Sequence, residues 1–532
     1  MINSVLKFIV IYADARSRTT SEPCSIQKSK SACMNSDRRR TSFLLWINGI
    51  KPVACFSLMK RSLWTLLLTL LLAPAYGHEA KSSATNSAYD QPLRPQFHFT
   101  ARTGWLNDPN GLVFYQGEYH LFFQHNPFGT QWGNMTWGHA ISKDMVHWQQ
   151  ISNALFPDSL GDMFSGSAVV DWHNDSGFKS GSNSPMVIFY TAAGGQGEKS
   201  KGKKFTQCLA YSTDGRNFQK FEGNPIIANR GGGDRDPKVF WHQASHHWIM
   251  VLFVDEARAD KKRVNTVQFF SSTDLKEWHF ESKLDDYFEC PDFFELPVAG
   301  KPNLKKWTLF AADGNYTLGE FDGHEFKADG PKHRGDFGPN FYAAQTYSDT
   351  PDNRRILVGW MRGGKYPNMP FNQQMAFPCE LTLTNTLNGV VLVKAPVTEI
   401  RRIYTDEFKW KNVNLKEGKS ISSTNRIADI DVELDPEAGS IVKLVCNGEP
   451  ITLDSNGRLG CKGATITLKP ASSHRLRVLV DVTSIEIYAE NGRSVLSACY
   501  LPAEGQYGIS LSALGTAHLK QMTIHGLASI WE

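Results

Sequence analysis

The sequence lacks most of the features that mark metal sites, disulfide-rich proteins and helical bundles. None of its nine cysteines stands in a C-x-x-C pair, which argues against a zinc site, and six cysteines spread over residues 208–499 are too few for a disulfide scaffold. If the chain is exported to an oxidising space, Cys446 and Cys461 are the pair best placed to bridge, across a hairpin turning at Asn456-Gly457. Helical periodicity is nearly absent, which favours an all-β protein.

Apart from its N-terminal residues, the sequence also has no large excess of positive or negative charge. Residues 1–77 carry 11 Lys or Arg and three Asp or Glu, so the formal net charge of +4 hides a mildly acidic body. An acidic body offers no electrostatic basis for binding nucleic acid. No nucleic-acid partner is therefore expected.

Only one apolar run stands out, and it is short. Leu63–Ala73 follows Lys60-Arg61 and precedes Ala75-Tyr76-Gly77, which is the form of a secretory signal peptide at 59–77. Eleven apolar residues are too few to span a hydrocarbon core of roughly 30 Å. We expect residues 1–58 to be an unstructured leader or the product of an upstream start codon, and 78–91 to be a linker. The mature protein is then secreted or periplasmic and free of the membrane.

A short pattern, Ser-x-Asp-x-x-x-aromatic, occurs three times. The copies begin at Ser142, Ser212 and Ser272, and Asp322–Phe326 is a weaker echo. Each copy lies between two strand-like runs, so its Asp is predicted to accept a backbone hydrogen bond in a tight turn while the aromatic residue packs on the sheet. The copies are 70 and 60 residues apart, about the size of a four-stranded propeller blade.

These spacings predict two domains. Residues 92–392 have room for a five-bladed β-propeller, whereas residues 400–532 lack the repeat and contain short period-2 runs, which favours a β-sandwich. Asn456-Gly457 and Asn491-Gly492 are strong hairpin signals in this second region. The runs are Ala464–Leu468, Leu476–Val480 and Ile485–Tyr488.

Three acidic residues stand beside Pro or aromatic residues at the predicted starts of blades. Asp108 lies in Trp-Leu-Asn-Asp-Pro-Asn-Gly, Asp236 lies in Arg-Asp-Pro after a Gly-rich loop, and Glu289 lies in Tyr-Phe-Glu-Cys-Pro. A lone loop acid is usually a turn former or a solvated side chain. A propeller directs the innermost strand of each blade toward a shared axis, however, so carboxylates that are distant in sequence can meet there.

Together with Phe164-Ser165-Gly166-Ser167, these motifs resemble the signature set of glycoside hydrolase family 32, the β-fructosidases. The resemblance covers roughly residues 92–525 and implies a five-bladed propeller followed by a β-sandwich. It implies that Asp108 is the nucleophile, Glu289 the general acid/base and Asp236 the transition-state stabiliser. The residues it implies for the sugar pocket are Trp105, Asn107, Gln124, Trp132, Phe164, Ser165, Arg235 and Trp360.

The chemistry needs these residue types. An anionic nucleophile stabilises and then captures an oxocarbenium-like centre, while a protonated carboxylic acid supplies the leaving oxygen with a proton. The aromatic sequence neighbours of Glu289 predict desolvation, which together with the nearby anionic Asp108 should raise the pKa of Glu289. Arg235 is expected to hold a neighbouring carboxylate ionised and in place. Retention requires the two carboxyl groups roughly 5–5.5 Å apart.

Other candidates for the site are weaker. Trp132 and Trp137 each suit either sugar binding or packing, whereas His246-His247 is a poor metal pair because adjacent strand residues point to opposite faces. No metal or cofactor is expected for hydrolysis.

The resemblance implies a secreted, retaining enzyme that releases terminal β-D-fructofuranosyl units from levan, inulin or sucrose. The alternatives are a sucrose-specific invertase, a fructosyltransferase, an inverting arabinan hydrolase on a related five-bladed fold, and a non-catalytic propeller that only binds fructan. The sequence does not predict the oligomeric state or the preferred linkage.

Overall fold

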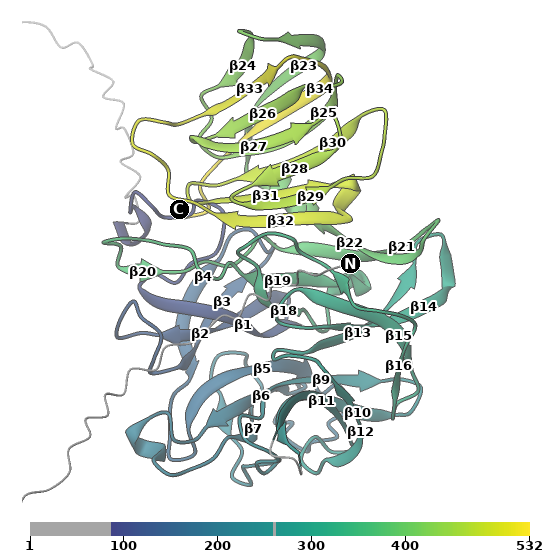
Figure 1. The fold of residues 1–532 in the computed structure, drawn as a ribbon. Helices are drawn as coiled ribbons and strands as arrows, with labels where there is room; N and C mark the ends of the chain where they lie inside the picture. Colours follow the sequence, from purple (N-terminus) through teal and green to yellow (C-terminus); the bar gives the residue numbers. More distant parts are fainter. Residues whose placement is uncertain (1–86, 259–261, 532) are drawn as a thin grey trace, which may run out of the picture. The chain divides into compact units, whose positions relative to one another are not determined.

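The computed structural model describes residues 87–258 and 262–531. The chain is a five-bladed β-propeller followed by a β-sandwich, which confirms the predicted fold class (Figure 1). The predicted leader, the signal peptide and most of the 78–91 linker lie outside the described residues. Within the described part, no helix is long and apolar enough to cross a membrane. The helices are short 3-10 turns: η1 (Ser87–Tyr89), η2 (Glu198–Ser200), η3 (Pro351–Asn353), η4 (Thr398–Ile403) and η5 (Glu490–Gly492).

Each blade is an antiparallel sheet of four strands in chain order, apart from one short strand between the second and third strands of the last blade. The first blade contains β1 (Gly104–Tyr115), β2 (Glu118–Asn126), β3 (Thr136–Ser142) and β4 (Gln149–Leu155). The second contains β5 (Asp162–Val170), β6 (Met186–Ala193), β7 (Thr206–Ser212) and β8 (Gln219–Lys220). The third contains β9 (Arg235–His242), β10 (His247–Ala257), β11 (Arg263–Ser272) and β12 (His279–Asp285).

The fourth and fifth blades are joined by a parallel bridge between β13 and β21. The fourth contains β13 (Asp292–Val298), β14 (Lys301–Phe310), β15 (Asn315–Phe321) and β16 (Phe326–Ala328), with β17 (His333–Arg334) beside β15. The fifth contains β18 (Tyr342–Thr346), β19 (Ile356–Trp360), β21 (Cys379–Thr386) and β22 (Gly389–Pro396). The short β20 (Phe371–Asn372) runs parallel to the start of β1. A bridge between Val113 and Ser348 links the first and last blades, so the ring of blades is closed.

Apolar side chains fill the spaces between neighbouring blades. Phe122 and Trp137 of the first blade pack with Ile188 and Tyr190 of the second, and all four are fully buried. The near-continuous apolar runs on these strands are explained by this burial on both faces, because a blade is covered by a neighbour on each side.

The repeated Ser-x-Asp pattern forms the turn between the third and fourth strands of a blade, as predicted. Asp144 Oδ1 accepts hydrogen bonds from the N–H groups of Val146 and His147 at 3.0 and 2.9 Å. Asp214 and Asp274 make the same pair of bonds after β7 and β11. The weaker echo is the same turn in the fourth blade, where Asp322 accepts two backbone N–H groups. The repeat therefore marks equivalent positions in four of the five blades.

The sandwich consists of two six-stranded sheets. One sheet contains β23 (Tyr404–Lys416), β25 (Ala428–Pro436), β30 (His474–Val480), β31 (Ser484–Ala489), β32 (Ser494–Cys499) and β34 (Thr516–Leu527). The other contains β24 (Ser420–Ser423), β26 (Ile441–Cys446), β27 (Glu449–Asp454), β28 (Arg458–Cys461), β29 (Ala464–Thr467) and β33 (Ile509–Leu514). Their inner faces share one apolar core. Asn456-Gly457 and Asn491-Gly492 turn two of the hairpins, as predicted.

The predicted disulfide is wrong, because Cys446 and Cys461 are both free. The hairpin at Asn456-Gly457 joins β27 to β28, but Cys446 lies on β26, where it pairs with Glu449 of β27. β27 therefore separates the two cysteines, and strands two apart in a sheet are roughly 9.5 Å from one another, too far for a disulfide.

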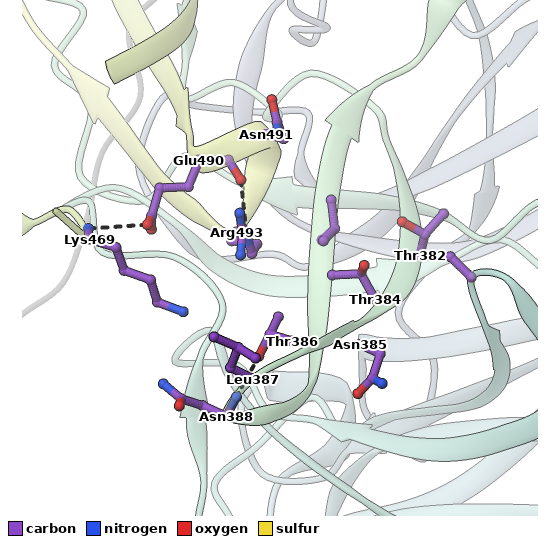
Figure 2. A pocket seen from close by; sticks show the side chains of 12 residues that line it. Thr382, Thr384, Asn385, Thr386, Leu387, Asn388, Lys469, Glu490, Asn491 and Arg493 are labelled. Carbon is purple, nitrogen blue, oxygen red and sulfur yellow. Dashed lines mark hydrogen bonds between the residues drawn. The ribbon is translucent and has the colours of Figure 1, made fainter. Parts of the chain in front are cut away.

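A polar pocket of about 830 Å³ lies where the β21–β22 hairpin faces η5. Figure 2 shows Thr384 and Asn388 from the hairpin on one side and Lys469 and Arg493 on the other. Apart from Trp105, the site residues that the sequence predicts line a different pocket, near the starts of the inner strands of the propeller.

Candidate active site

The first strands of the blades begin around one pocket of about 310 Å³. β1 supplies Asp108, β5 supplies Ser165, β9 supplies Asp236, the segment before β13 supplies Glu289, and β18 supplies Tyr342. Acids that are far apart in the sequence therefore line one wall because equivalent strands converge. The other lining residues are Asn107, Gln124, Trp132, Phe164, Arg235, Phe288, Trp360 and Arg362.

Asp108 lies at an irregularity in β1. The pairing of β1 with β2 shifts between Leu106 and Pro109, and a bulge of this kind redirects a side chain out of the regular alternation. Asp108 Oδ2 accepts a 2.6 Å hydrogen bond from Ser165 Oγ, and Oδ1 accepts one from Asn107 Nδ2 at 3.1 Å. Burial raises the pKa of Asp108, and the bond from Ser165 opposes that rise.

Asp236 is the most enclosed of the three acids. Its backbone has φ +66°, in the left-handed region that few residues other than Gly adopt. The Asp236 N–H donates to Thr191 Oγ1 at 3.0 Å, and Oδ2 accepts from the Cys290 N–H, also at 3.0 Å. Burial raises the pKa of Asp236 to about 7, against the lowering effect of Arg235. Backbone strain at an enclosed carboxylate is typical of functional sites.

Glu289 is held by two polar partners. The Nε and Nη2 atoms of Arg235 donate to Glu289 Oε2 at 2.8 and 2.5 Å, and the Tyr342 hydroxyl donates to Oε1 at 2.6 Å. The surroundings of this carboxylate are thus more polar than its aromatic sequence neighbours indicate, because Phe288 is partly exposed instead of covering it. Arg235 does hold a neighbouring carboxylate in place, and that carboxylate is Glu289.

Cys290 lies between the other two acids. Its Sγ is 3.5 Å from Asp108 Oδ2 and 3.4 Å from Asp236 Oδ2. Burial raises the pKa of the Cys290 thiol well above its ordinary value, so the sulfur stays protonated. The thiol S–H can then donate a hydrogen bond to one of the two carboxylates. Both carboxylates therefore face one small volume.

The remaining walls combine aromatic rings with amides. Trp132 is half exposed, and its ring lies edge-on to Phe164 at 5.8 Å. Trp137 packs instead of lining the pocket: it is fully buried and its indole N–H donates to the Phe164 carbonyl. Gln124 is fixed by donation to the Met163 carbonyl at 2.9 Å.

Trp105 differs from the expectation that it lines the sugar pocket. Its indole Nε1 donates to Asn107 Oδ1 at 2.8 Å, and its ring lies 6.1 Å from that of Trp360. Trp105 is not among the residues that line the pocket, but it orients Asn107, which in turn donates to Asp108.

Three lining residues escaped the sequence analysis: Phe288, Tyr342 and Arg362. Arg362 stacks over the Tyr342 and Trp360 rings at 4.5 and 5.9 Å. Phe288 stands in the Tyr-Phe-Glu-Cys-Pro motif beside Glu289, whereas Tyr342 and Arg362 belong to no motif. Assigning β18 as the inner strand of the fifth blade would have pointed to Tyr342, because the inner strands of the other blades also place residues near their starts in the pocket.

Among the described residues, no group of three or more His, Cys, Asp or Glu side chains has the arrangement of a metal site. His246 lies in the turn before β10, whereas His247 begins that strand and contacts the Ser245 carbonyl.

An axial pocket with three convergent carboxylates and aromatic walls defines the protein as a glycosidase. The model of the glycosyl hydrolases family 32 N-terminal domain matches residues 98–396, and that of the family 32 C-terminal domain matches residues 452–526. The chain belongs to glycoside hydrolase family 32.

Individual proteins agree with this assignment. The chain is 37% identical to the levanase of Bacillus subtilis over 527 residues, covering 88% of this chain and 74% of the levanase. It is similar to the crystal structure of an exo-inulinase from Aspergillus awamori, with a TM-score of 0.75 and 27% identity over 83% of this chain and 100% of that one. A fructofuranosidase from Schwanniomyces occidentalis in complex with fructose gives a TM-score of 0.73 and 28% identity over 84% and 100% of the two chains.

Proposed function

We propose that this glycosidase is a retaining β-fructosidase that releases terminal β-D-fructofuranosyl units from fructans such as levan and inulin, and from sucrose. The observation that carries the proposal is the convergence of Asp108, Asp236 and Glu289 on one small pocket in a family 32 fold. The names of its relatives, a levanase and an exo-inulinase, support fructans as substrates.

In the first step, a carboxylate oxygen of Asp108 attacks C2 of the terminal fructosyl unit. The bond from C2 to the leaving oxygen breaks, and that oxygen takes a proton from Glu289. In the second step, Glu289 removes a proton from water, the water oxygen bonds to C2, and Asp108 leaves as a carboxylate. Fructose is released with its configuration retained, and both acids return to their starting state.

Several contacts prepare the two acids for these roles. Ser165 and Asn107 fix the Asp108 carboxylate, so little reorganisation is needed before attack. Arg235 and Tyr342 fix Glu289 in the same pocket. For the first step Glu289 must carry a proton, so we expect substrate entry to loosen its contact with Arg235. The 5–5.5 Å separation of the two carboxyl groups stays a prediction.

Asp236 suits the stabilising role. It lies in a buried setting, where a carboxylate interacts strongly with positive charge developing at C2 and with the hydroxyl groups of the ring. Because Arg235 and the Cys290 N–H direct its side chain, Asp236 is oriented before the substrate arrives.

The pocket size favours attack at chain ends. A volume of about 310 Å³ is at the small end of ligand pockets and suits one or two sugar rings. We propose exo action for this reason.

The predicted signal peptide and the extracellular exo-inulinases among the relatives support a secreted or periplasmic enzyme. Hydrolysis by two carboxylic acids needs no cofactor.

Incubation with levan, inulin and sucrose, followed by chromatography of the products, tests the proposal. Free fructose from all three substrates supports it. Cleavage of sucrose alone indicates an invertase, growing oligosaccharides indicate fructosyl transfer, and release of arabinose from arabinan indicates the arabinan hydrolase. Binding of fructan without any turnover indicates a non-catalytic propeller and contradicts the proposal.

A further inference from the structure

A second pocket lies at the opposite end of the strands that carry the active site. β5 runs from Phe164 and Ser165 in the catalytic pocket to Val170 in this second pocket, and β9 runs from Arg235 toward Trp241. The connection between β18 and β19 also reaches it, whereas the other ends of those two strands reach the catalytic pocket. The cavity has about 370 Å³, slightly more than the catalytic one. We call it the distal pocket.

Aromatic side chains dominate one wall of the distal pocket. Trp172 lies two residues after the end of β5 and is 59% exposed, an unusual position for a side chain of this size. Trp241 and Trp248 line the same pocket with ring centroids 5.2 Å apart, and His173 stands edge-on to Trp241 at 5.7 Å. The Trp248 indole N–H donates to Asp175, so that ring is held in place. Trp248 is buried and Trp241 is partly buried, so Trp172 is the indole of these three that stands open to solvent.

Polar groups complete the lining of the pocket. The Asp349 carboxylate accepts from the Trp172 indole N–H at 2.8 Å and from the Val170 N–H at 3.2 Å, which ties the exposed Trp172 to the rim. Arg355 is anchored by donation from Nη1 to the Tyr347 carbonyl at 3.0 Å. Arg354 is paired with Glu380 and Glu399.

Asp349, Arg354 and Arg355 line the pocket, and the charge of Arg354 is already compensated by Glu380 and Glu399, which lie outside the lining. The charges around the pocket therefore nearly cancel. A strongly charged ligand would therefore gain little from it. Carboxylate and guanidinium groups beside an indole platform suit a neutral ring with hydroxyl edges and an apolar face, which is a sugar. The catalytic pocket has the same composition: aromatic rings, carboxylates and two arginines.

We propose that the distal pocket is a second, non-catalytic binding site for a fructosyl unit of polymeric fructan, with Trp172 as its stacking platform. The inference rests on the proposed function for the identity of the sugar, although the pocket itself does not depend on catalysis. A polymer held at the distal pocket keeps chain ends close to the enzyme and raises their effective concentration. Sucrose is too small to gain from such a contact.

Affinity electrophoresis in native gels containing levan tests the proposal. The Glu289→Gln protein serves as the parent because it should not degrade the gel. Adding Trp172→Ala should weaken retardation by levan about tenfold, as expected for loss of a central aromatic contact. Trp172→Tyr should keep most of the retardation. Phe280→Ala, a comparably exposed aromatic residue on the outer strand of the third blade, is the matched control and should change nothing.

In the active protein, Trp172→Ala should leave kcat/KM for sucrose unchanged and raise KM for levan. Undiminished retardation of Trp172→Ala would overturn the proposal even if the enzyme cleaves fructan. A changed sedimentation coefficient with unchanged retardation would assign the pocket to contact between copies of the chain and would also overturn it. If the parent cleaves no fructoside but Trp172 still governs retardation by levan, the proposed function fails and the distal site stands.

Discussion

Two clusters of acidic residues in this molecule differ in how their charges are paired. In the catalytic pocket, Arg235 is the close cation of both Asp236 and Glu289, whereas Asp108 is held by hydrogen bonds from Ser165 and Asn107. Where the propeller meets the sandwich, Asp481 and Glu486 have His98 between them, and Asp336 has Lys394.

The junction acids are satisfied on all sides. Asp481 accepts from His98 Nδ1 at 2.8 Å and from three backbone N–H groups of residues 96–98, while Glu486 accepts from His98 Nε2 at 2.9 Å. Asp336 accepts from Lys394 Nζ at 2.9 Å and from the hydroxyl and N–H groups of Ser497. Burial costs these acids little because each has its partners.

The two clusters show how an acidic residue that stabilises the fold differs from one that takes part in catalysis. A buried carboxylate with a matched cation holds domains together, whereas buried carboxylates in excess of cations are costly to keep and are kept where they react. The raised pKa values of Asp108 and Asp236, both caused first by burial, are the signature of the second kind. The substitutions that follow test whether the acids of the catalytic pocket affect turnover and those of the junction affect stability.

The largest effect is expected from the catalytic acids. Asp108→Asn and Glu289→Gln should each lower kcat on sucrose by about 10⁴-fold or more, since a nucleophile or an acid/base is lost while shape is kept. Their melting temperatures should match or exceed that of the parent. Steady-state kinetics and thermal melting check both halves, and near-parental turnover in either variant would refute the assigned roles.

The next largest effect is expected at the junction. His98→Ala removes the cation between Asp481 and Glu486 and should lower the free energy of unfolding by about 3–5 kcal/mol. Turnover per folded molecule should stay near the parental value, because His98 contacts the sandwich and not the pocket. Urea denaturation and active-site titration measure the two quantities. A stable variant would show that the junction acids do not need their partner.

The same pair predicts a pH dependence of stability. Although burial alone lowers it, hydrogen bonds to Asp481 and Glu486 raise the pKa of His98 from 6.5 to about 9. A raised folded-state pKa gives stability that is complete below pH 6.5 and is lost as the pH rises through 9. Denaturation curves between pH 6 and 10 should show this loss in the parent and a flatter profile in His98→Ala.

The smallest expected effect is a gain in stability instead of a loss. Because burial raises the pKa of Asp236 to about 7, ionising this group costs the folded state stability as the pH rises from about 4 through 7. Asp236→Asn removes that cost and should raise the free energy of unfolding at pH 8 by about 1 kcal/mol or more, since one pKa unit corresponds to 1.36 kcal/mol. Loss of stability at pH 8 would place Asp236 with the structural acids.

Much of the fold could be predicted from the sequence because the blades repeat the same local turn. The Asp of that turn needs only neighbouring N–H groups, so the pattern at Asp144, Asp214 and Asp274 survives without help from distant residues. The Asn-Gly hairpins of the sandwich are local in the same sense. The disulfide prediction failed because which strands neighbour Cys446 and Cys461 is decided by the order of strands in the sheet.

The site was predictable where motifs exist and not elsewhere. The three acids and most of the predicted sugar-binding residues line one pocket, yet Tyr342 and Arg362 lie in ordinary sequence and enter the pocket only through the closure of the fifth blade. Trp105 is in a motif, but its indole faces Asn107 instead of the cavity. The polar setting of Glu289 depends on Arg235, which is 54 residues away.

The most direct test of the distinction compares Asp108→Asn with Asp481→Asn, measured side by side for kcat on sucrose and for free energy of unfolding. Asp108→Asn should lose about 10⁴-fold or more in turnover and no stability, whereas Asp481→Asn should lose several kcal/mol of stability and keep its turnover per folded molecule. If Asp108→Asn unfolds more easily while remaining active, or if Asp481→Asn abolishes turnover in a stable protein, the two clusters have been assigned the wrong way round.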